Sequence, residues 1–126
     1  MSKSQRTKGA GGERELCGIL SDALGQVVKR KLGQARDSGN DIDIAPFRIE
    51  CKRRKHIGNL YEWLKQAEGD IDNPARVDGL WYDGTTGRWY RRIATPVVAL
   101  RADGNEWLVV MRLSDWIELA REEIAK

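Results

Sequence analysis

The stretch DIDIAPFRIECK, residues 41–52, alternates apolar and polar side chains. A period of two is typical of β-strands, so the stretch predicts a β-hairpin that turns at its Pro-Phe pair. Ile42 and Ile44 share one face of the first strand, and Ile49 and Cys51 share one face of the second. The hydrophobic residues therefore gather on one side of the hairpin and the charged residues on the other.

Helical spacing of apolar residues predicts three helices, over residues 11–24, 59–72 and 114–126. Gly25 is expected to end the first helix, while Asn59 and Ser114 are expected to cap the other two. In the last helix the apolar side chains are expected to face inward, namely Trp116, Ile117, Ala120 and Ile124.

Further strands are expected on both sides of the middle helix. The β-branched segment 26–32 predicts a strand, and a loop follows over residues 33–40. Residues 76–94 predict a hairpin, interpreted as an insertion, and residues 96–113 predict another hairpin. The order of these elements predicts an α/β fold in which helices flank a mixed central β-sheet.

Length and composition indicate one domain. The chain has 126 residues, 40% hydrophobic and 33% charged, so it can bury a modest core. Residues 1–8 are expected to be a flexible basic tail and residues 9–126 the folded domain. No apolar run reaches the roughly 18 residues of a membrane span, so no membrane partner is expected, and the N-terminus lacks the features of a secretory signal. Cys17 and Cys51 are interpreted as buried thiols of a reducing cytoplasm.

Basic residues cluster, although the net charge is only +3. The runs are KRK at 29–31, KRRK at 52–55 and RWYRR at 88–92. One such run is typical of a solvated surface, but three runs in a small chain favour a polyanionic partner.

The polar side of the first hairpin gathers carboxylates. Any register that stacks the isoleucines places Asp41 and Asp43 on the face that carries Glu50 and Lys52. Neighbouring carboxylates repel each other, which a purely structural hairpin would avoid. A divalent cation removes the repulsion, and Mg²⁺ prefers oxygen ligands of this kind. The pattern therefore predicts a metal site.

Glu13 is a further candidate ligand. It precedes Leu16 and Leu20 on the apolar face of the first helix, whereas Glu15 points away from that face. A carboxylate on an inward face needs a partner, and the acidic hairpin with its metal would provide one. The alternative is a glutamate at a fraying helix start, favoured there by the helix dipole.

The ordered motifs GGERE, GND and IECK resemble the signature of the PD-(D/E)xK nuclease superfamily. Within it, the chain looks most like the archaeal-type and phage Holliday-junction resolvases, through KGAGGERELCGIL, RDSGND and the Glu-x-Lys hairpin. The resemblance covers roughly residues 8–72, together with the general pattern of PVVALRADGNEWLVVMRLSDW. The chain departs from the family pattern in two places. Asn40-Asp41 stands where the family has Pro-Asp, and the segment 76–94 looks like an insertion.

The resemblance implies a restriction-endonuclease-like core and Mg²⁺-dependent hydrolysis of DNA phosphodiester bonds, with Mn²⁺ as a substitute. The implied metal ligands are Glu13, Asp41 and Glu50 with the backbone carbonyl of Cys51; Asp41 ranks first, and Asp43 stays open as the alternative. Lys52 would orient the attacking water and neutralise charge on the phosphate. Gln66 is assigned to the catalytic site by resemblance alone.

The implied partner is branched double-stranded DNA, cut by a homodimer because two symmetric cuts need two sites. The assigned DNA contacts are Lys29, Arg30, Lys31, Arg36, Ser38, Arg53, Arg54 and Lys55. Ser38 fits a plain turn equally well. The aromatic residues near RWYRR either stack on junction bases or pack in a core. The implied location is the cytoplasm of a bacterium or of a phage-infected host.

Two other functions stay open. One is a less selective nuclease of the same superfamily, acting on flaps, mismatches or foreign DNA. The other is a non-catalytic DNA-binding protein in which the acidic residues are incidental. The second is disfavoured because the motif residues Glu13, Asp41, Glu50 and Lys52 are all present.

Overall fold

The predicted hairpin forms two neighbouring strands of the main β-sheet. The computed structural model describes residues 3–31, 41–44, 46–68, 77–83, 87–93 and 95–126. Strand β1 (Ile42–Ile44) pairs antiparallel with β2 (Phe47–Arg54), and Ile42 lies opposite Ile49. The apolar side chains therefore stack across the two strands, as their alternation predicted.

Strand β2 lies in the interior of the sheet. Strand β5 (Thr95–Ala102) pairs parallel with it, and β6 (Leu108–Val110) pairs antiparallel with β5. The strand order is β1-β2-β5-β6. The β5–β6 turn contains Gly104 at φ +76°, a conformation that glycine adopts without strain. The hairpin predicted over residues 96–113 is thus confirmed.

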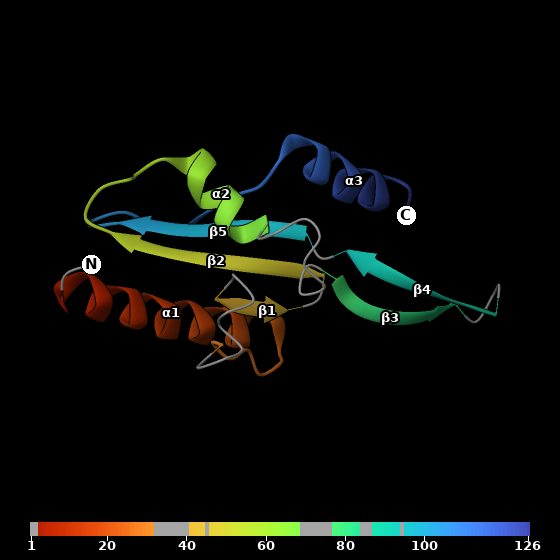
Figure 1. The fold of residues 1–126 in the computed structure, drawn as a ribbon, viewed down its shortest axis with the longest axis horizontal. Coiled ribbons are helices and arrows are strands. Elements are labelled where there is room, and N and C mark those ends of the chain that lie inside the picture. The colour runs from red at the N-terminus through yellow and green to blue at the C-terminus, as the bar shows by residue number, and fades with distance from the viewer. Residues whose placement is uncertain (1–2, 32–40, 45, 69–76, 84–86, 94) are drawn as a thin grey trace.

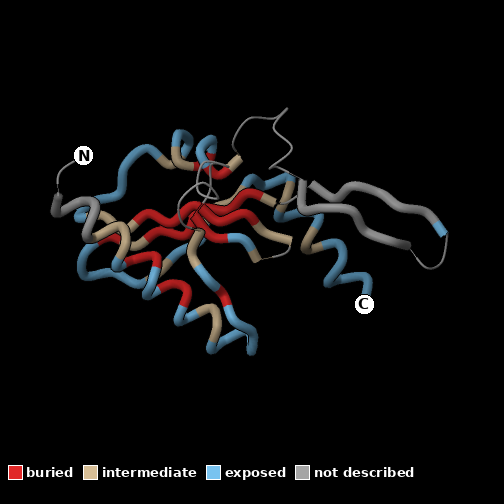
Figure 2. The backbone as a smooth tube through the Cα atoms, turned by 60° about the horizontal axis from the view of Figure 1, so that its bottom comes forward, coloured by how far each residue is buried: buried red, intermediate tan, exposed pale blue. Residues whose placement is uncertain are grey.

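Helices α1 (Lys3–Leu24) and α2 (Leu60–Glu68) cover opposite faces of this sheet (Figure 1). The core on the α1 side consists of Leu16, Cys17, Val28, Ile42, Ile49, Cys51 and Ala99. The core on the α2 side consists of Leu64, Ala67, Val98 and Leu100. Buried positions therefore concentrate on the central strands and on the helix faces that touch them (Figure 2).

A second, two-stranded sheet extends away from the main one (Figure 1). It consists of β3 (Val77–Asp83) and β4 (Arg88–Ile93), which pair antiparallel. The hairpin expected within residues 76–94 is confirmed, and its interpretation as an insertion stays a prediction. The α/β class, with a mixed sheet between helices, is also confirmed. No described element is specific to a restriction-endonuclease-like core.

The first helix is longer than the sequence pattern predicts. It begins at Lys3 instead of near Gly11, so most of the segment expected as a flexible tail is helical. Lys8 links this part of the helix to the turn between β5 and β6, because its Nζ donates to both carboxylate oxygens of Asp103 at 2.9 and 3.0 Å. The predicted end of the helix is confirmed, with Gly25 at φ +67°.

The strand predicted over residues 26–32 is wrong for its described part, residues 26–31. Within that part Arg30 forms an isolated bridge with Ile42, and the remaining residues belong to no strand. Val27 is 79% exposed, so this β-branched side chain has no sheet surface to pack against. The loop predicted at 33–40 lies outside the described residues.

The two later helices differ in how well their caps were predicted. Asn59 caps α2, because its Oδ1 accepts hydrogen bonds from the N–H groups of Tyr61 and Glu62 at 3.1 and 3.2 Å. Helix α2 is described to Glu68, and residues 69–72 of the predicted helix lie outside the described ranges. Ser114 does not cap the last helix.

Helix α3 (Leu113–Ile124) starts one residue before Ser114, after an extended Arg112 that makes no side-chain cap hydrogen bond. None of its residues is buried. Trp116 is 57% exposed and Ile124 is 83% exposed, so the expected inward orientation of its apolar stripe is wrong. None of its residues belongs to either core cluster.

Candidate functional site

Buried charged residues mark one face of β2. Arg48, Glu50 and Lys52 occupy alternate positions of the strand and are all buried. Their neighbours Ile49 and Cys51 belong to the core on the α1 side. Because successive side chains of a strand point to opposite faces, the three charged residues face the α2 side. This charged face is the candidate site.

Asp41 completes the site from the start of β1. Its backbone N–H donates to the Ile49 carbonyl at 3.0 Å, which places it opposite Glu50. Its buried side chain accepts a hydrogen bond at Oδ2 from the backbone N–H of Cys51 at 2.8 Å. Asp41 therefore lies directly beside Glu50.

Asp43 lies elsewhere. It pairs with Arg48 across the hairpin and forms an ion pair with Lys31, with 3.1 Å between Oδ2 and Nζ. Its side chain is largely exposed. Of the two aspartates that the sequence left open, Asp41 is the one that the register places next to Glu50.

The site holds two carboxyl groups at an electrostatic cost. Burial, and after it the charge of Asp41, raises the pKa of the Glu50 carboxyl to about 7. Lys52 acts in the opposite direction, with its Nζ 3.3 Å from Glu50 Oε1. The Glu50 carboxyl therefore exchanges a proton with solvent near neutral pH, and a bound cation would replace that proton.

Glu13 approaches from the other side of the sheet. It is buried on α1, as its position in the helix predicted, and Glu15 is exposed. Its Oε2 lies 2.9 Å from Arg30 Nε, so Glu13 forms a buried ion pair. Arg30, assigned to a DNA contact by the sequence, is a structural partner here.

The two cysteines are buried thiols, as predicted. Burial raises the pKa of Cys17 and of Cys51, and the charges of Asp41, Glu13 and Glu50 raise that of Cys51 further. A thiol with a raised pKa is protonated at neutral pH and is a poor nucleophile. The contribution of Cys51 to the site is therefore its backbone, through the bond to Asp41.

The donor set suits a hard cation. Among the residues that the structure describes, no three His, Cys, Asp or Glu side chains gather as a metal centre. Mg²⁺, however, is commonly held by one or two carboxylates together with water and ligand phosphates. Asp41 and Glu50 offer such a pair, so the residues present fit Mg²⁺ or Mn²⁺.

The other predicted site residues are scattered. Gln66 is exposed on α2, on the helix face opposite to Leu64 and Ala67. Lys29 and Lys55 are exposed, whereas Arg53 forms an ion pair with Asp103 at 2.6 Å. Arg36 and Ser38 lie outside the described residues. Several basic side chains of the runs are therefore engaged in ion pairs within the fold.

Two residues of the site, Arg48 and Trp63, were given no role in it by the sequence analysis. Arg48 shares the buried face of β2, and Trp63 of α2 lies over Lys52, with 5.8 Å from Nζ to the ring centroid. The strand alternation that selected Glu50 also selects Arg48, so the signal for it was present. Trp63 has no such signal, because the placement of α2 on the sheet is a tertiary feature.

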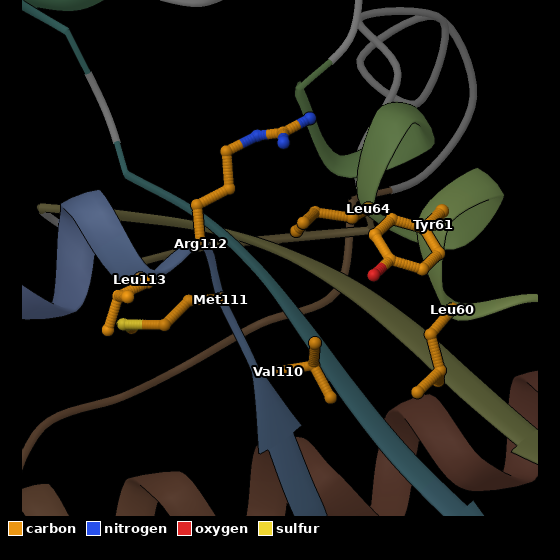
Figure 3. A pocket seen from close by; sticks show the side chains of 7 residues that line it. All are labelled: Leu60, Tyr61, Leu64, Val110, Met111, Arg112 and Leu113. Atoms are coloured by element: carbon orange, nitrogen blue, oxygen red, sulfur yellow. The ribbon is translucent and has the colours of Figure 1, made fainter.

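A separate apolar groove of about 350 Å³ lies beside α2 (Figure 3). It is lined by Leu60, Tyr61 and Leu64 of α2, by Val110 at the end of β6, and by Met111, Arg112 and Leu113. Arg112 reaches past the groove to form an ion pair with Glu68 of α2. The groove is distinct from the charged face of β2.

Comparison with known proteins gives a partial match. AA9 family lytic polysaccharide monooxygenase H of Thermothelomyces thermophilus is 38% identical over 61 residues, which cover 43% of this chain. The chain spans 16% of the length of that relative. No family model and no solved structure matches the chain.

The match contradicts the assignment to the PD-(D/E)xK superfamily. The relative is a monooxygenase named for polysaccharide, and none of the comparisons found a nuclease. The inferred endonuclease activity, the junction-resolvase identity and the roles in DNA recombination and repair are corrected accordingly. The motifs GGERE, GND and IECK are short and fix few residues each, so their order along the chain did not establish the family.

None of the described helices is long and apolar enough to cross a membrane.

Proposed function

We propose that this protein binds a divalent cation, Mg²⁺ or Mn²⁺, through Asp41 and Glu50, and that the cation and Lys52 together hold a phosphate group of an anionic ligand. The observation that carries the proposal is the contact of two buried carboxyl groups beside a buried ammonium group. Two carboxyl groups that share one buried site repel each other, and a divalent cation bound to both would relieve that repulsion.

The chemistry of the donors supports this choice of metal. Carboxylate oxygens suit Mg²⁺ and Mn²⁺, and such ions complete their coordination with water and ligand phosphates. Lys52 is positioned to contact a phosphate oxygen at the same place, because its Nζ lies beside the Glu50 carboxylate. Glu13 and the carbonyl of Cys51, also predicted as ligands, stay predictions.

Titration calorimetry with Mg²⁺ and Mn²⁺ at pH 8 tests the metal site. We expect wild type to bind one cation and Asp41→Asn and Glu50→Gln to lose at least tenfold in affinity. Asp43→Asn separates the two aspartates, and Glu62→Gln, an exposed carboxylate of α2, is the matched control. Both should bind as wild type does. Equal binding by wild type and Glu50→Gln would overturn the site.

The ligand class is tested separately by fluorescence anisotropy, with and without Mg²⁺. The probes are inorganic polyphosphate, linear duplex DNA, a four-way DNA junction and a neutral glucan. We expect Mg²⁺-dependent binding of the phosphate-bearing probes, weakened in Lys52→Gln but not in the control Lys65→Gln, which alters an exposed lysine of α2. Branched double-stranded DNA as the natural partner stays a prediction. Binding of the glucan alone would contradict the proposal and favour the relative's ligand class.

We also infer a homodimer and a cytoplasmic location. The exposed apolar residues of α3, Trp116 and Ile124 among them, support burial against a second copy of this chain. Two buried, unpaired thiols support a reducing compartment.

A further inference from the structure

Lys52 is held on two sides. Its Nζ lies 3.3 Å from Glu50 Oε1 and 5.8 Å from the centroid of the Trp63 ring. The Arg54 guanidinium lies 6.0 Å from the same centroid. A cation within about 6 Å of an indole face is attracted by the negative potential of the ring, and more strongly where water is excluded. Lys52 is buried, so water weakens this attraction less than it would at an exposed site.

The position of the Trp63 ring is itself fixed by the start of α2. Asn59 caps the helix, and its carbonyl accepts a hydrogen bond from the Trp63 N–H at 3.1 Å. Gly58 leaves room for the ring, because a Cβ atom there would lie 2.8 Å from Trp63 Cζ2. The indole also packs against the core cluster on the α2 side. The ring therefore has little freedom to move away from Lys52.

We propose that Trp63 is a positioning residue, which holds the Lys52 ammonium group beside the Asp41 and Glu50 carboxyl groups and so presets it for a phosphate oxygen. A lysine side chain has four rotatable bonds, and fixing it costs conformational entropy on binding. Contacts with Trp63 and Glu50 already restrict the Lys52 side chain in the free protein. Less conformational entropy is therefore lost when a ligand binds. The phosphate contact rests on the proposed function, whereas the positioning of Lys52 does not.

NMR of the lysine side chains of the metal-free protein tests the positioning directly. The ring current of Trp63 should shift the Lys52 Hε and Cε resonances away from those of exposed Lys55, which serves as the internal reference. We expect Trp63→Leu to abolish the shift and Trp63→Phe to retain part of it. Trp116→Leu, on the exposed face of α3, is the matched control and should leave the shift unchanged.

Gly58→Ala provides a second route that keeps the indole. Its methyl group should displace the ring and alter the Lys52 shift even if Trp63→Leu fails to fold. Unchanged Lys52 resonances in both folded variants would overturn the proposal, as would unchanged resonances in Gly58→Ala alone if the other variant is unfolded.

Ligand binding then separates this inference from the proposed function. We expect Trp63→Leu to weaken Mg²⁺-dependent binding of polyphosphate about fivefold while changing Mg²⁺ affinity less than twofold. If wild type binds no metal but Trp63→Leu still loses the Lys52 shift, the proposed function fails and the positioning stands. If metal and polyphosphate bind equally well to both proteins, the presetting role of Trp63 is wrong.

Discussion

The Asp41 carboxylate accepts a hydrogen bond of 2.8 Å from the backbone N–H of Cys51. This bond fixes a buried carboxylate at the point where β1 meets the middle of β2, directly beside Glu50. A residue of the site is thus hydrogen-bonded to the backbone of the sheet. Substitutions in the site should therefore change the free energy of unfolding.

The free energy of unfolding should depend on pH through the protonation of Glu50. Its pKa is raised from 4.5 to about 7 in the folded protein, so between these values the native state binds more protons than the unfolded state. The free energy of unfolding should therefore fall as pH rises from about 5 to 8, by as much as about 3 kcal/mol. Urea denaturation at several pH values measures this, and Glu50→Gln should flatten the profile. The same slope in that variant would rule out Glu50 as its source.

Mg²⁺ affinity should rise with pH over the same range. The cation must displace the proton that Glu50 carries below a pKa of about 7. We expect roughly tenfold tighter binding at pH 8 than at pH 6, from the fraction of ionised carboxyl alone. Calorimetry in two buffers of different protonation enthalpy would also detect the released proton. Affinity independent of pH would contradict a role for Glu50 as ligand.

Asp41 should matter to the fold as well as to the site. Asp41→Ala leaves the buried Cys51 N–H without its acceptor, and the expected loss is about 1–3 kcal/mol of stability. Asp41→Asn keeps an oxygen acceptor and should lose less. Asp43→Asn, which alters an exposed side chain, should lie within about 0.5 kcal/mol of wild type. Thermal melts of the three variants in metal-free buffer make the comparison.

Removing Glu13 should be costly, because Arg30 would then be a partly buried charge without its carboxylate. We expect Glu13→Ala to lower the free energy of unfolding by about 3 kcal/mol. The control is Glu15→Ala, which breaks an exposed pair with Arg101 and should cost no more than about 1 kcal/mol. Comparable losses in both variants would show that the buried pair contributes nothing special.

The exposed face of α3 should govern the oligomeric state. Light scattering should give twice the 14.3 kDa chain mass for wild type. Trp116→Lys places a charge on that face and should shift the protein to the monomer, while its unfolding midpoint at low concentration stays unchanged. Lys126→Glu, at the exposed end of the chain, is a control that should leave the mass unaltered. A monomeric wild type would contradict the dimer.

The sequence predicted the structure correctly where the alternation of apolar and polar residues was sufficient to define it. Alternation alone placed the isoleucines of β1 against β2 and put both aspartates on the face that carries Glu50, because the side chains of a paired strand divide between two faces. It left Asp41 and Asp43 undecided, since that choice needs the pairing of Ile42 with Ile49, which is a contact between strands.

Predictions from local sequence failed where the apolar side chains have no other element to pack against. Val27 is β-branched, yet it is exposed and outside any strand. The apolar stripe of α3 has helical spacing, but no described element covers it closely enough to bury Trp116. Trp63 acquired its position over Lys52 through the packing of α2, which no period in the sequence encodes. Short motif matches failed for a related reason, because they carry no information on tertiary context.

In strand β2 the position of a residue along the strand decides which face of the sheet its side chain occupies. Ile49 and Cys51 contribute to the core on the α1 side, and the alternate residues Arg48, Glu50 and Lys52 form the charged site. A substitution changes one side chain, but a single inserted or deleted residue would turn every following side chain to the opposite helix. After an insertion before them, Glu50 would face the core on the α1 side and Cys51 would face the α2 side. We therefore expect the fold to tolerate a change of length in this strand only at its ends.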